Sequence, residues 1–275
     1  MRFIKLLLIA ASIISLSCGR EELDSLPVYF ISGGQVYSID FNGGNLKRLT
    51  NDANTYESVS SSMDGEDILL SDSSGKMYVM NYKGGTPVYF MDGRFGTYGP
   101  SGNIYFALKD GTSHNTIARS DPSGNNITSL KLIDTNAYIM SISVSYDETE
   151  LATHYQLLGP SYSIKINLLN LGAPVTSFNG GIGMSYSTLN KDILVYNSTF
   201  LRITRPDTTY SDVYTSTYSS LSLGAWSPDV SFIFFAYNDS NPKEIRRIKS
   251  DGTEMITLGY FNTAINTFCV LGKPR

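Results

Sequence analysis

The chain has 275 residues, an ordinary apolar fraction of 41% and a low charged fraction of 17%. Its 19 tyrosines and 24 glycines, together with many Ser, Thr and Asn residues, suit strands and tight turns better than helices. The formal net charge of −4 comes without a basic stripe, which argues against a nucleic-acid-binding protein.

The first 17 residues differ in character from the rest of the chain. A short basic segment, Met1 to Lys5, precedes an apolar run from Leu6 to Leu16 that only serines interrupt. This run is shorter than the roughly 20 apolar residues of a membrane-spanning helix, and its layout is that of a secretory signal. We therefore predict that residues 1–17 are a signal peptide.

Cys18 follows directly, in the sequence Ser15-Leu16-Ser17-Cys18-Gly19. This segment resembles a bacterial lipoprotein signal, although Ser15 stands where that motif prefers leucine. The resemblance implies that Cys18 carries palmitate-type acyl chains, and two or more chains give a stable membrane anchor. The protein would then be attached at the outer membrane or the periplasmic face, with residues 18–26 as a tether. Ordinary cleavage, giving a secreted or periplasmic protein, is the alternative.

The second cysteine, Cys269, has no disulfide partner if Cys18 carries lipid, because the chain has only two cysteines. Its neighbours Phe268, Val270 and Leu271 are apolar. We therefore expect Cys269 to be a small buried hydrophobic residue rather than a reactive thiol.

The rest of the chain repeats with a period of about 40 residues. In the repeat a Ser-x-Asp-Gly type of turn, which the first copy lacks, leads into a hydrophobic strand, followed by a second strand, an Asp/Asn-x-x-Gly turn and a third strand. The copies that contain Val28, Ser62 and Trp226 are the clearest, and those near Ser101 and Ser145 are among the weaker ones. Equivalent strand positions lie 36 to 47 residues apart: Val28, Ile68, Ile104, Leu151, Ile193 and Ile233.

A period of this length with four short strands in each copy predicts a β-propeller. The segments lack the 3.6-residue periodicity that helical repeats would show. A single four-stranded sheet leaves its faces exposed, whereas sheets arranged around an axis cover one another. We therefore expect an all-β, six-bladed propeller of four-stranded antiparallel blades.

The first copy lacks an innermost strand, and a strand-like segment at 264–271 follows the sixth copy. We predict that this C-terminal segment completes the first blade. Pairing of the two chain ends would close the ring and remove an exposed sheet edge.

The repeat Ser-x-Asp-Gly-x-x-Ile, a Tyr-containing strand and Asn/Asp-x-x-Gly-Gly-x-x-x-x-Leu-Thr resembles the TolB-type propeller repeat. The resemblance covers about residues 27 to 272 and implies a TolB-like propeller domain over residues 27–275. It also implies a face that binds proteins or peptides of the cell envelope. About nine residues separate Cys18 from Val28, so we expect no counterpart of the additional N-terminal domain of TolB.

No catalytic constellation stands out in the sequence. The only histidines are His114, in a polar loop, and His154, which we expect at the end of the inner strand of the fourth blade. Neither accompanies a Gly-x-Ser-x-Gly motif or the clustered His and Cys ligands of a zinc site. We therefore predict no catalytic residue, cofactor or metal site.

Three aspartates, Asp64, Asp147 and Asp229, recur in the turn expected before each inner strand. We interpret them as side chains that accept hydrogen bonds from turn amides. Some propeller lactonases and related hydrolases hold a cation in the central channel, and such a metal-dependent enzyme is the alternative function.

These observations predict a monomeric, non-catalytic envelope lipoprotein whose propeller face binds a protein or peptide. A lipoprotein whose exposed face meets host molecules is a further alternative. The stretch 206–223 departs most from the repeat, and we expect it to supply a loop, the outer strand of blade five and the inner strand of blade six. Loops that depart from a repeat are often functional.

Overall fold

The computed structural model describes residues 26–62, 64–110, 113–157, 161–167, 174–178, 183–216, 221–238 and 240–270. Within these ranges the chain forms strands, turns and bends, and none of it is helical. No described segment is a helix of the length and apolarity that crossing a membrane requires. The predicted all-β class is therefore confirmed for the described residues.

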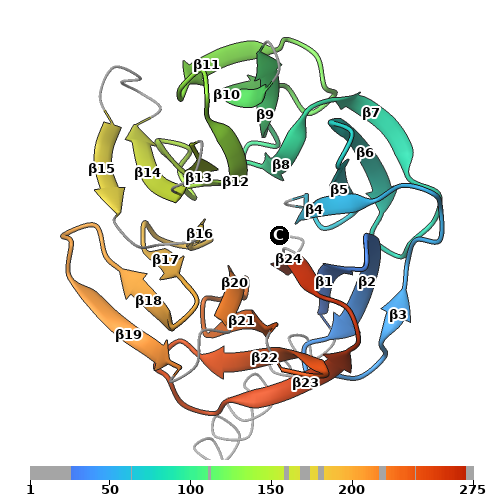
Figure 1. Ribbon diagram of the computed structural model, residues 1–275, viewed down its shortest axis with the longest axis vertical. Helices are drawn as coiled ribbons and strands as arrows, with labels where there is room; N and C mark the ends of the chain where they lie inside the picture. Colours follow the sequence, from blue (N-terminus) through green and yellow to red (C-terminus); the bar gives the residue numbers. More distant parts are fainter. Residues whose placement is uncertain are drawn as a thin grey trace, which may run out of the picture.

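Figure 1 looks down the axis of a ring of six four-stranded antiparallel sheets, each named below by its strands from the centre outward. The first sheet contains β24 (Ile265–Val270), β1 (Pro27–Ser32), β2 (Gln35–Asp40) and β3 (Lys47–Arg48). The second contains β4 (Tyr56–Ser61), β5 (Asp67–Asp72), β6 (Lys76–Asn81) and β7 (Val88–Asp92). The third contains β8 (Arg94–Tyr98), β9 (Ile104–Asp110), β10 (Ser113–Ser120) and β11 (Thr128–Leu132).

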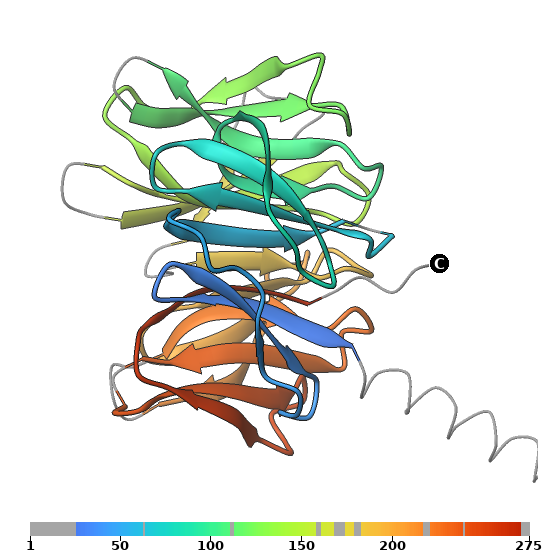
Figure 2. The same cartoon turned by 90° about the vertical axis from the view of Figure 1, so that its right-hand side faces the viewer.

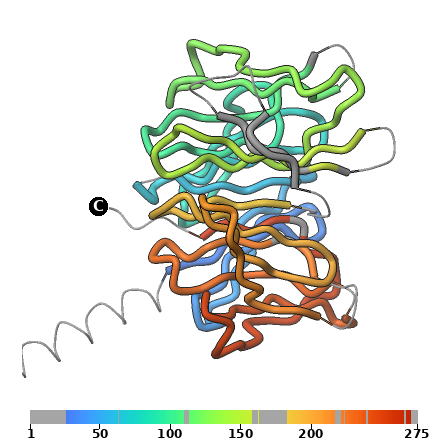
Figure 3. The backbone as a smooth tube through the Cα atoms, turned by 90° about the vertical axis from the view of Figure 1, so that its left-hand side faces the viewer, coloured from blue at the N-terminus to red at the C-terminus, as the bar shows by residue number. Residues whose placement is uncertain are grey.

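The fourth sheet contains β12 (Tyr138–Val144), β13 (Glu150–Gln156), β14 (Ser161–Asn167) and β15 (Pro174–Phe178). The fifth contains β16 (Gly183–Tyr186), β17 (Ile193–Tyr196), β18 (Phe200–Thr204) and β19 (Tyr210–Thr215). The sixth contains β20 (Leu221–Trp226), β21 (Phe232–Tyr237), β22 (Lys243–Lys249) and β23 (Ile256–Phe261). The predicted four-stranded antiparallel blades are confirmed, and the stretch 206–223 supplies β19 and part of β20 as expected. In side view the strands run between the two faces of the ring (Figures 2 and 3).

The two described ends of the chain meet in the first sheet. Strand β24 pairs antiparallel with β1, and in this register Val28 lies opposite Val270. The C-terminal strand therefore occupies the innermost place that the first repeat copy left empty. Because β24 lies beside β4 and β20, it also takes its place among the other innermost strands around the centre (Figure 1).

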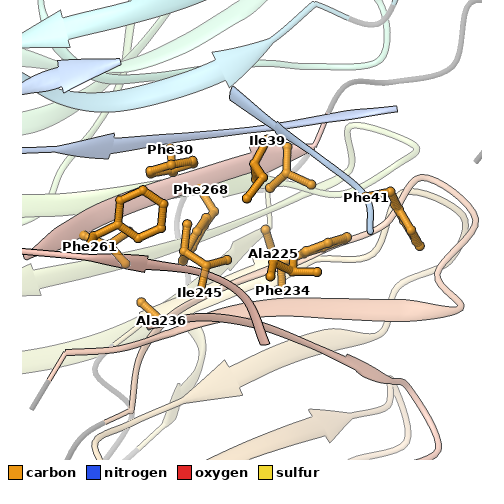
Figure 4. Close-up of a cluster of buried hydrophobic side chains, with 12 residues drawn as sticks. Phe30, Ile39, Phe41, Ala225, Phe234, Ala236, Ile245, Phe261 and Phe268 are labelled. Carbon is orange, nitrogen blue, oxygen red and sulfur yellow. The ribbon is translucent and has the colours of Figure 1, made fainter. Parts of the chain in front are cut away.

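The hydrophobic core lies between neighbouring sheets rather than within one sheet. The six repeat positions used to detect the period all fall on second strands and are 0 to 3% exposed. Between the first and sixth sheets, Phe30 packs edge-on against Phe261, with ring centroids 4.8 Å apart (Figure 4). Phe41 packs in the same way on Phe234 at 5.2 Å. Aromatic pairs of this geometry add stability beyond their buried area, so this seam is firmly packed.

The Ser-x-Asp turns have a different place in the fold from the one expected. Each follows an innermost strand and leads into the second strand, because the innermost strand comes first in the chain order of its sheet. The predicted role of the aspartates in bonding turn amides is confirmed, because Asp229 accepts the N–H of Ser231 at 3.2 Å and Asp64 and Asp147 accept the equivalent amides of their turns. The Ser227 hydroxyl donates to Asp229 at 2.6 Å, and its oxygen accepts the N–H of Phe232 at 2.9 Å. The corresponding serine and aspartate bonds recur in two other sheets, at Ser62, Asp64, Ser145 and Asp147.

Replacing Ile265 with alanine should destabilise the ring strongly. Ile265 lies on the closing strand β24 and is 1% exposed. Truncation of a buried isoleucine to alanine typically costs about 2–5 kcal/mol of unfolding free energy. Urea unfolding of Ile265→Ala should show this loss, whereas Leu46→Ala, at a position 52% exposed, should change stability little. Equal, small effects for both variants would show that β24 contributes little to the fold.

Candidate functional site

The innermost strands β4, β8, β12, β16, β20 and β24 surround a central channel with a cavity of about 280 Å³. Every one of the six sheets contributes to its wall. The volume lies at the lower limit of the range for small-molecule pockets. The channel therefore has room for a side chain or a short extended segment, but not for a folded element.

The wall of this channel is neutral and rich in hydroxyl groups. Among the described residues that line it, Glu57 is the single charged side chain. Hydroxyl groups donate and accept hydrogen bonds, so this wall suits a polar, uncharged ligand surface such as a peptide backbone. Eight serines line it: Ser58, Ser60, Ser61, Ser62, Ser141, Ser143, Ser185 and Ser187.

Hydrogen bonds between neighbouring sheets hold the wall in place. The Ser61 hydroxyl donates to the carbonyl of Val270 at 3.2 Å. The Ser143 hydroxyl accepts the N–H of Tyr186 at 2.8 Å. The Trp226 indole donates to the carbonyl of Ser185 at 3.1 Å. Because each bond joins innermost strands of adjacent sheets, the channel is formed before any ligand arrives.

Five of the six innermost strands carry a one-residue β-bulge near their first residues. The paired register skips Glu57 in β4, Met140 in β12 and Leu223 in β20. In β8 the segment between Arg94 and Thr97 has one residue more than the facing segment of β9. In β24 the residue without a partner is Asn266. Bulges re-aim side chains and are common beside functional sites. Glu57, Phe95 and Met140 all line the channel, so the bulges turn non-repeated side chains toward one of its ends.

A buried ion pair lies at this end of the channel. The Arg94 guanidinium donates through Nη2 to Glu57, and the Arg94 side chain is only 10% exposed. The guanidinium carbon lies 5.0 Å from the centre of the Phe95 ring and 4.8 Å from that of Tyr138. Its Nε is buried and has no hydrogen-bond partner among the described residues. Burial lowers the pKa of Arg94, but an arginine side chain stays charged in proteins.

Phe95 adopts a strained backbone conformation in this cluster. Its φ of 52° lies in the left-handed region, which is uncommon for a bulky residue. Such a conformation costs about 1–3 kcal/mol and persists where the surroundings impose it. The Phe95 amide donates to the Ser71 hydroxyl at 3.1 Å, and the Phe95 ring covers the Arg94 guanidinium. Strain at this point agrees with a functional role for the bulged end.

Both histidines lie elsewhere than expected, and neither is among the residues that line the channel. His114 is on strand β10, not in a loop, and its ring lies edge-on 6.4 Å from that of Tyr138. Burial, together with the charges of Arg94 and Lys109, lowers the pKa of His114 to about 4. His154 lies within β13, the second strand of its sheet, rather than at the end of an inner strand. The positions differ because turn residues do not reveal how far a strand extends.

The structure tests the prediction for one of the two cysteines, Cys269. Cys18 and the predicted signal peptide lie outside the described residues. Cys269 is a free thiol on β24 that lines the channel and is partly exposed, so the expectation of a buried residue was only partly right. Burial of its sulfur raises the pKa of Cys269 to about 12, which keeps the thiol protonated at neutral pH. Within the described residues no group of three or more His, Cys, Asp or Glu side chains is placed to hold a metal ion.

Sequence reasoning missed Glu57, Arg94 and Tyr138. They lie at the beginnings of three innermost strands, which carry no turn motif and vary between the copies. Their side chains meet only because the first residues of β4, β8 and β12 converge at the centre of the ring (Figure 1). A charged residue within the otherwise neutral first strand of a copy is the signal that could have identified them.

Comparisons with known proteins agree with this architecture. No family model and no curated protein matches the chain. TolB from Acinetobacter baumannii is 13% identical, with a TM-score of 0.72 over 90% of this chain and 66% of that chain. A chain of a nidogen/laminin complex is 8% identical, with a TM-score of 0.71 over 90% of this chain and all of that one, 100%. A structure from Agrobacterium tumefaciens assigned to TolB is 15% identical, with a TM-score of 0.66 over 88% of this chain and 92% of that chain. At these identities the comparisons show a shared fold, that of a TolB-like β-propeller.

Replacing His154 with glutamine should weaken the acid sensitivity of the fold. Burial lowers the pKa of His154 to about 4, from about 6.5 in an unfolded chain. The unfolded chain therefore takes up a proton near pH 6.5 that the folded chain takes up only near pH 4, and stability is lost as the pH falls between these values. The loss that this residue causes should be on the order of 3 kcal/mol.

Urea unfolding at pH 7.5 and pH 4 measures the effect. His154→Gln should lose less stability on acidification than the unmodified chain. His114 is present in both proteins, so the difference between them isolates His154. An identical pH dependence in the two proteins would show that His154 is not desolvated in the folded state.

Proposed function

We propose that this chain is a non-catalytic, lipid-anchored protein of the bacterial cell envelope whose propeller binds a protein or peptide at the central channel. The observation that carries the proposal is the preformed, neutral, hydroxyl-lined channel with a ring of bulges at one end. A rigid wall of hydroxyl groups can pair with the N–H and C=O groups of an extended chain. Little ordering is then needed on binding, which favours affinity.

The shared fold supports the same function. This chain is similar to TolB in both its repeat and its structure, and that resemblance implies a face that binds proteins or peptides of the envelope. A propeller of the same fold is part of a nidogen/laminin complex. The channel also offers Tyr98, Tyr186 and Trp226, and aromatic residues are enriched where proteins bind one another.

The channel supports a binding function better than the alternative of a cation-dependent hydrolase. Calcium takes six to eight oxygen ligands, and carboxylates are prominent among them. The described lining supplies a single carboxylate, Glu57, which is already paired with Arg94. The recurring Asp64, Asp147 and Asp229 are engaged in their own turns. A melting temperature that rises with calcium would favour the hydrolase, because a bound ion stabilises the folded state.

Replacing Cys18 with alanine should remove the membrane anchor. Cells grown with radioactive palmitate should label the unmodified protein, and fractionation should find it with the membranes. Cys18→Ala should carry no label and leave the membrane fraction, because the acyl chains supply the attachment. Cys269→Ala is the matched control and should keep both properties. Label that persists in Cys18→Ala would contradict the anchor, whereas membrane release without any label in either protein would indicate ordinary secretion.

A photoreactive residue at either end of the channel should capture a partner in intact cells. Met140 and Tyr146 are suitable positions, because both line the channel and are exposed, at 38% and 43%. We expect a discrete cross-linked protein at one of these positions or both, identified by mass spectrometry. The same residue at Tyr210, which is 59% exposed on the outer strand β19, is the control and should not capture that protein. If neither channel position captures a protein, the proposed binding function is wrong.

A further inference from the structure

The channel has two ends of different character. All six innermost strands begin at one end, which we call the bulge mouth and define by Glu57, Phe95 and Met140. They finish at the other end, the turn mouth, defined by Ser62 and Tyr146 beside the Ser-x-Asp turns. The two mouths open on opposite faces of the ring, because the strands run from one face to the other (Figure 2).

The described chain ends both lie at the turn mouth. Val28 pairs with Val270, and the Val270 carbonyl accepts a hydrogen bond from Ser61 at the finish of β4. A segment that leads from residue 18 to the start of β1 therefore joins the ring on this face. Nine residues span at most about 30 Å when fully extended. An anchor on Cys18 would keep the turn mouth near the membrane and leave the bulge mouth facing the compartment.

The bulge mouth contains an incompletely paired arginine. Nε and Nη2 form one edge of a planar guanidinium, and a carboxylate can take both of them at once. Glu57 takes Nη2 of Arg94 alone, while Nε is buried without a partner among the described residues. A buried donor that lacks a hydrogen bond is costly. A carboxylate aligned along this edge would satisfy both donors, so the site is poised to exchange Glu57 for a better-aligned carboxylate.

The surroundings of Arg94 hold it in place for this exchange. The rings of Phe95 and Tyr138 lie against the guanidinium at 5.0 and 4.8 Å, so its position does not depend on Glu57 alone. The Glu57 side chain is 27% exposed, which leaves it room to move aside. Met140 offers a soft apolar contact next to the pair, at 38% exposure. Beyond the mouth, the neutral hydroxyl wall continues along the channel.

From these contacts we propose that the partner docks at the bulge mouth through an acidic segment of its chain, whose carboxylate takes the place of Glu57 on Arg94. The proposal rests on the binding function proposed above and names the mouth and the chemistry it recognises. An acidic peptide fits better than a free small carboxylate, because only an extended chain would also use the hydroxyl wall. An aspartate or glutamate side chain, or a C-terminal carboxylate, would serve equally.

Cross-linking in intact cells tests the mouth. A photoreactive residue at Met140 should capture the partner, and the mapped contact should contain an acidic residue or a C-terminus. Capture should fall about tenfold in Arg94→Gln, since removing one member of a buried charged pair is costly to binding. It should not fall in Glu57→Gln, which keeps Arg94 and removes its competitor.

Arg202→Gln is the matched control. Arg202 also pairs with a carboxylate, that of Asp212, and lies over the rings of Phe200 and Tyr210 at 4.6 and 3.9 Å. It is on β18, the third strand from the centre of its sheet, and its carboxylate partner does not line the channel at the bulge mouth, so capture should be unchanged. Circular dichroism melting shows whether Arg94→Gln is folded. If it is not, Arg94→Lys replaces it, because lysine keeps the charge but cannot form the two-donor edge.

A synthetic peptide of the mapped segment then tests the carboxylate. The chain has one tryptophan, and Trp226 lines the channel, so its fluorescence reports binding. Changing the acidic residue of the peptide to its amide should weaken binding to the unmodified protein about tenfold, and should have little further effect on Arg94→Gln. Equal effects of the amide on both proteins would overturn the role of Arg94.

The outcomes separate the two proposals. Capture at Tyr146 alone would overturn the bulge mouth and leave the binding function standing. Capture at Met140 that Arg94→Gln and Arg94→Lys both leave unchanged would overturn carboxylate recognition. Capture at neither position would remove the binding function, and this inference with it.

Discussion

The structure depends on the fact that a four-stranded sheet has two faces to cover. Each hydrophobic cluster among the described residues contains residues of two neighbouring sheets. The six repeat positions are buried because a neighbouring sheet covers them: Val28, Ile68, Ile104, Leu151, Ile193 and Ile233. A row of such sheets would expose a face at each end. The ring avoids this, with β24 paired to β1 and with Phe30, Phe41, Phe234 and Phe261 filling the seam between the last sheet and the first.

The channel is a consequence of the same arrangement. Six innermost strands that converge on an axis leave a narrow space between them, lined by serines as well as by core residues such as Met184 and Trp226. Serine predominates in that wall, with hydroxyls that bridge adjacent strands, such as Ser61 to Val270. The bulges are superimposed on this regular pattern. They break the alternation at one end of five strands, and Glu57, Phe95 and Met140 line the channel at that end.

The chemistry of the site follows from how few charges the channel contains. Among the described residues, the wall has one carboxylate, Glu57, and one neighbouring arginine, Arg94. It supplies a directional charge at one end of a neutral tube. In a medium of low dielectric constant such a charge discriminates strongly between ligands, because an uncompensated partner is costly to bury. The proposed recognition of a carboxylate at the bulge mouth uses this property.

The sequence by itself determined the repeat, the strands and the turns. Val28, Ile68 and the other apolar positions recur because the second strand of every sheet is buried against a neighbouring sheet. Asp64, Asp147 and Asp229 recur because each of these turns has the same hydrogen bonds to its amides. The order of strands within a sheet was less accessible, so the turns were assigned to the wrong side of the innermost strands.

Only the tertiary structure decided the site. Glu57 and Arg94 are 37 residues apart and Tyr138 is in a third sheet, and none of them belongs to a motif. A bulge is defined by the register between two paired strands. The sequence of one strand alone does not specify that register. The physical reason is that a repeat encodes what each sheet has in common, whereas the contacts at the channel mouth join different sheets at positions where the copies differ.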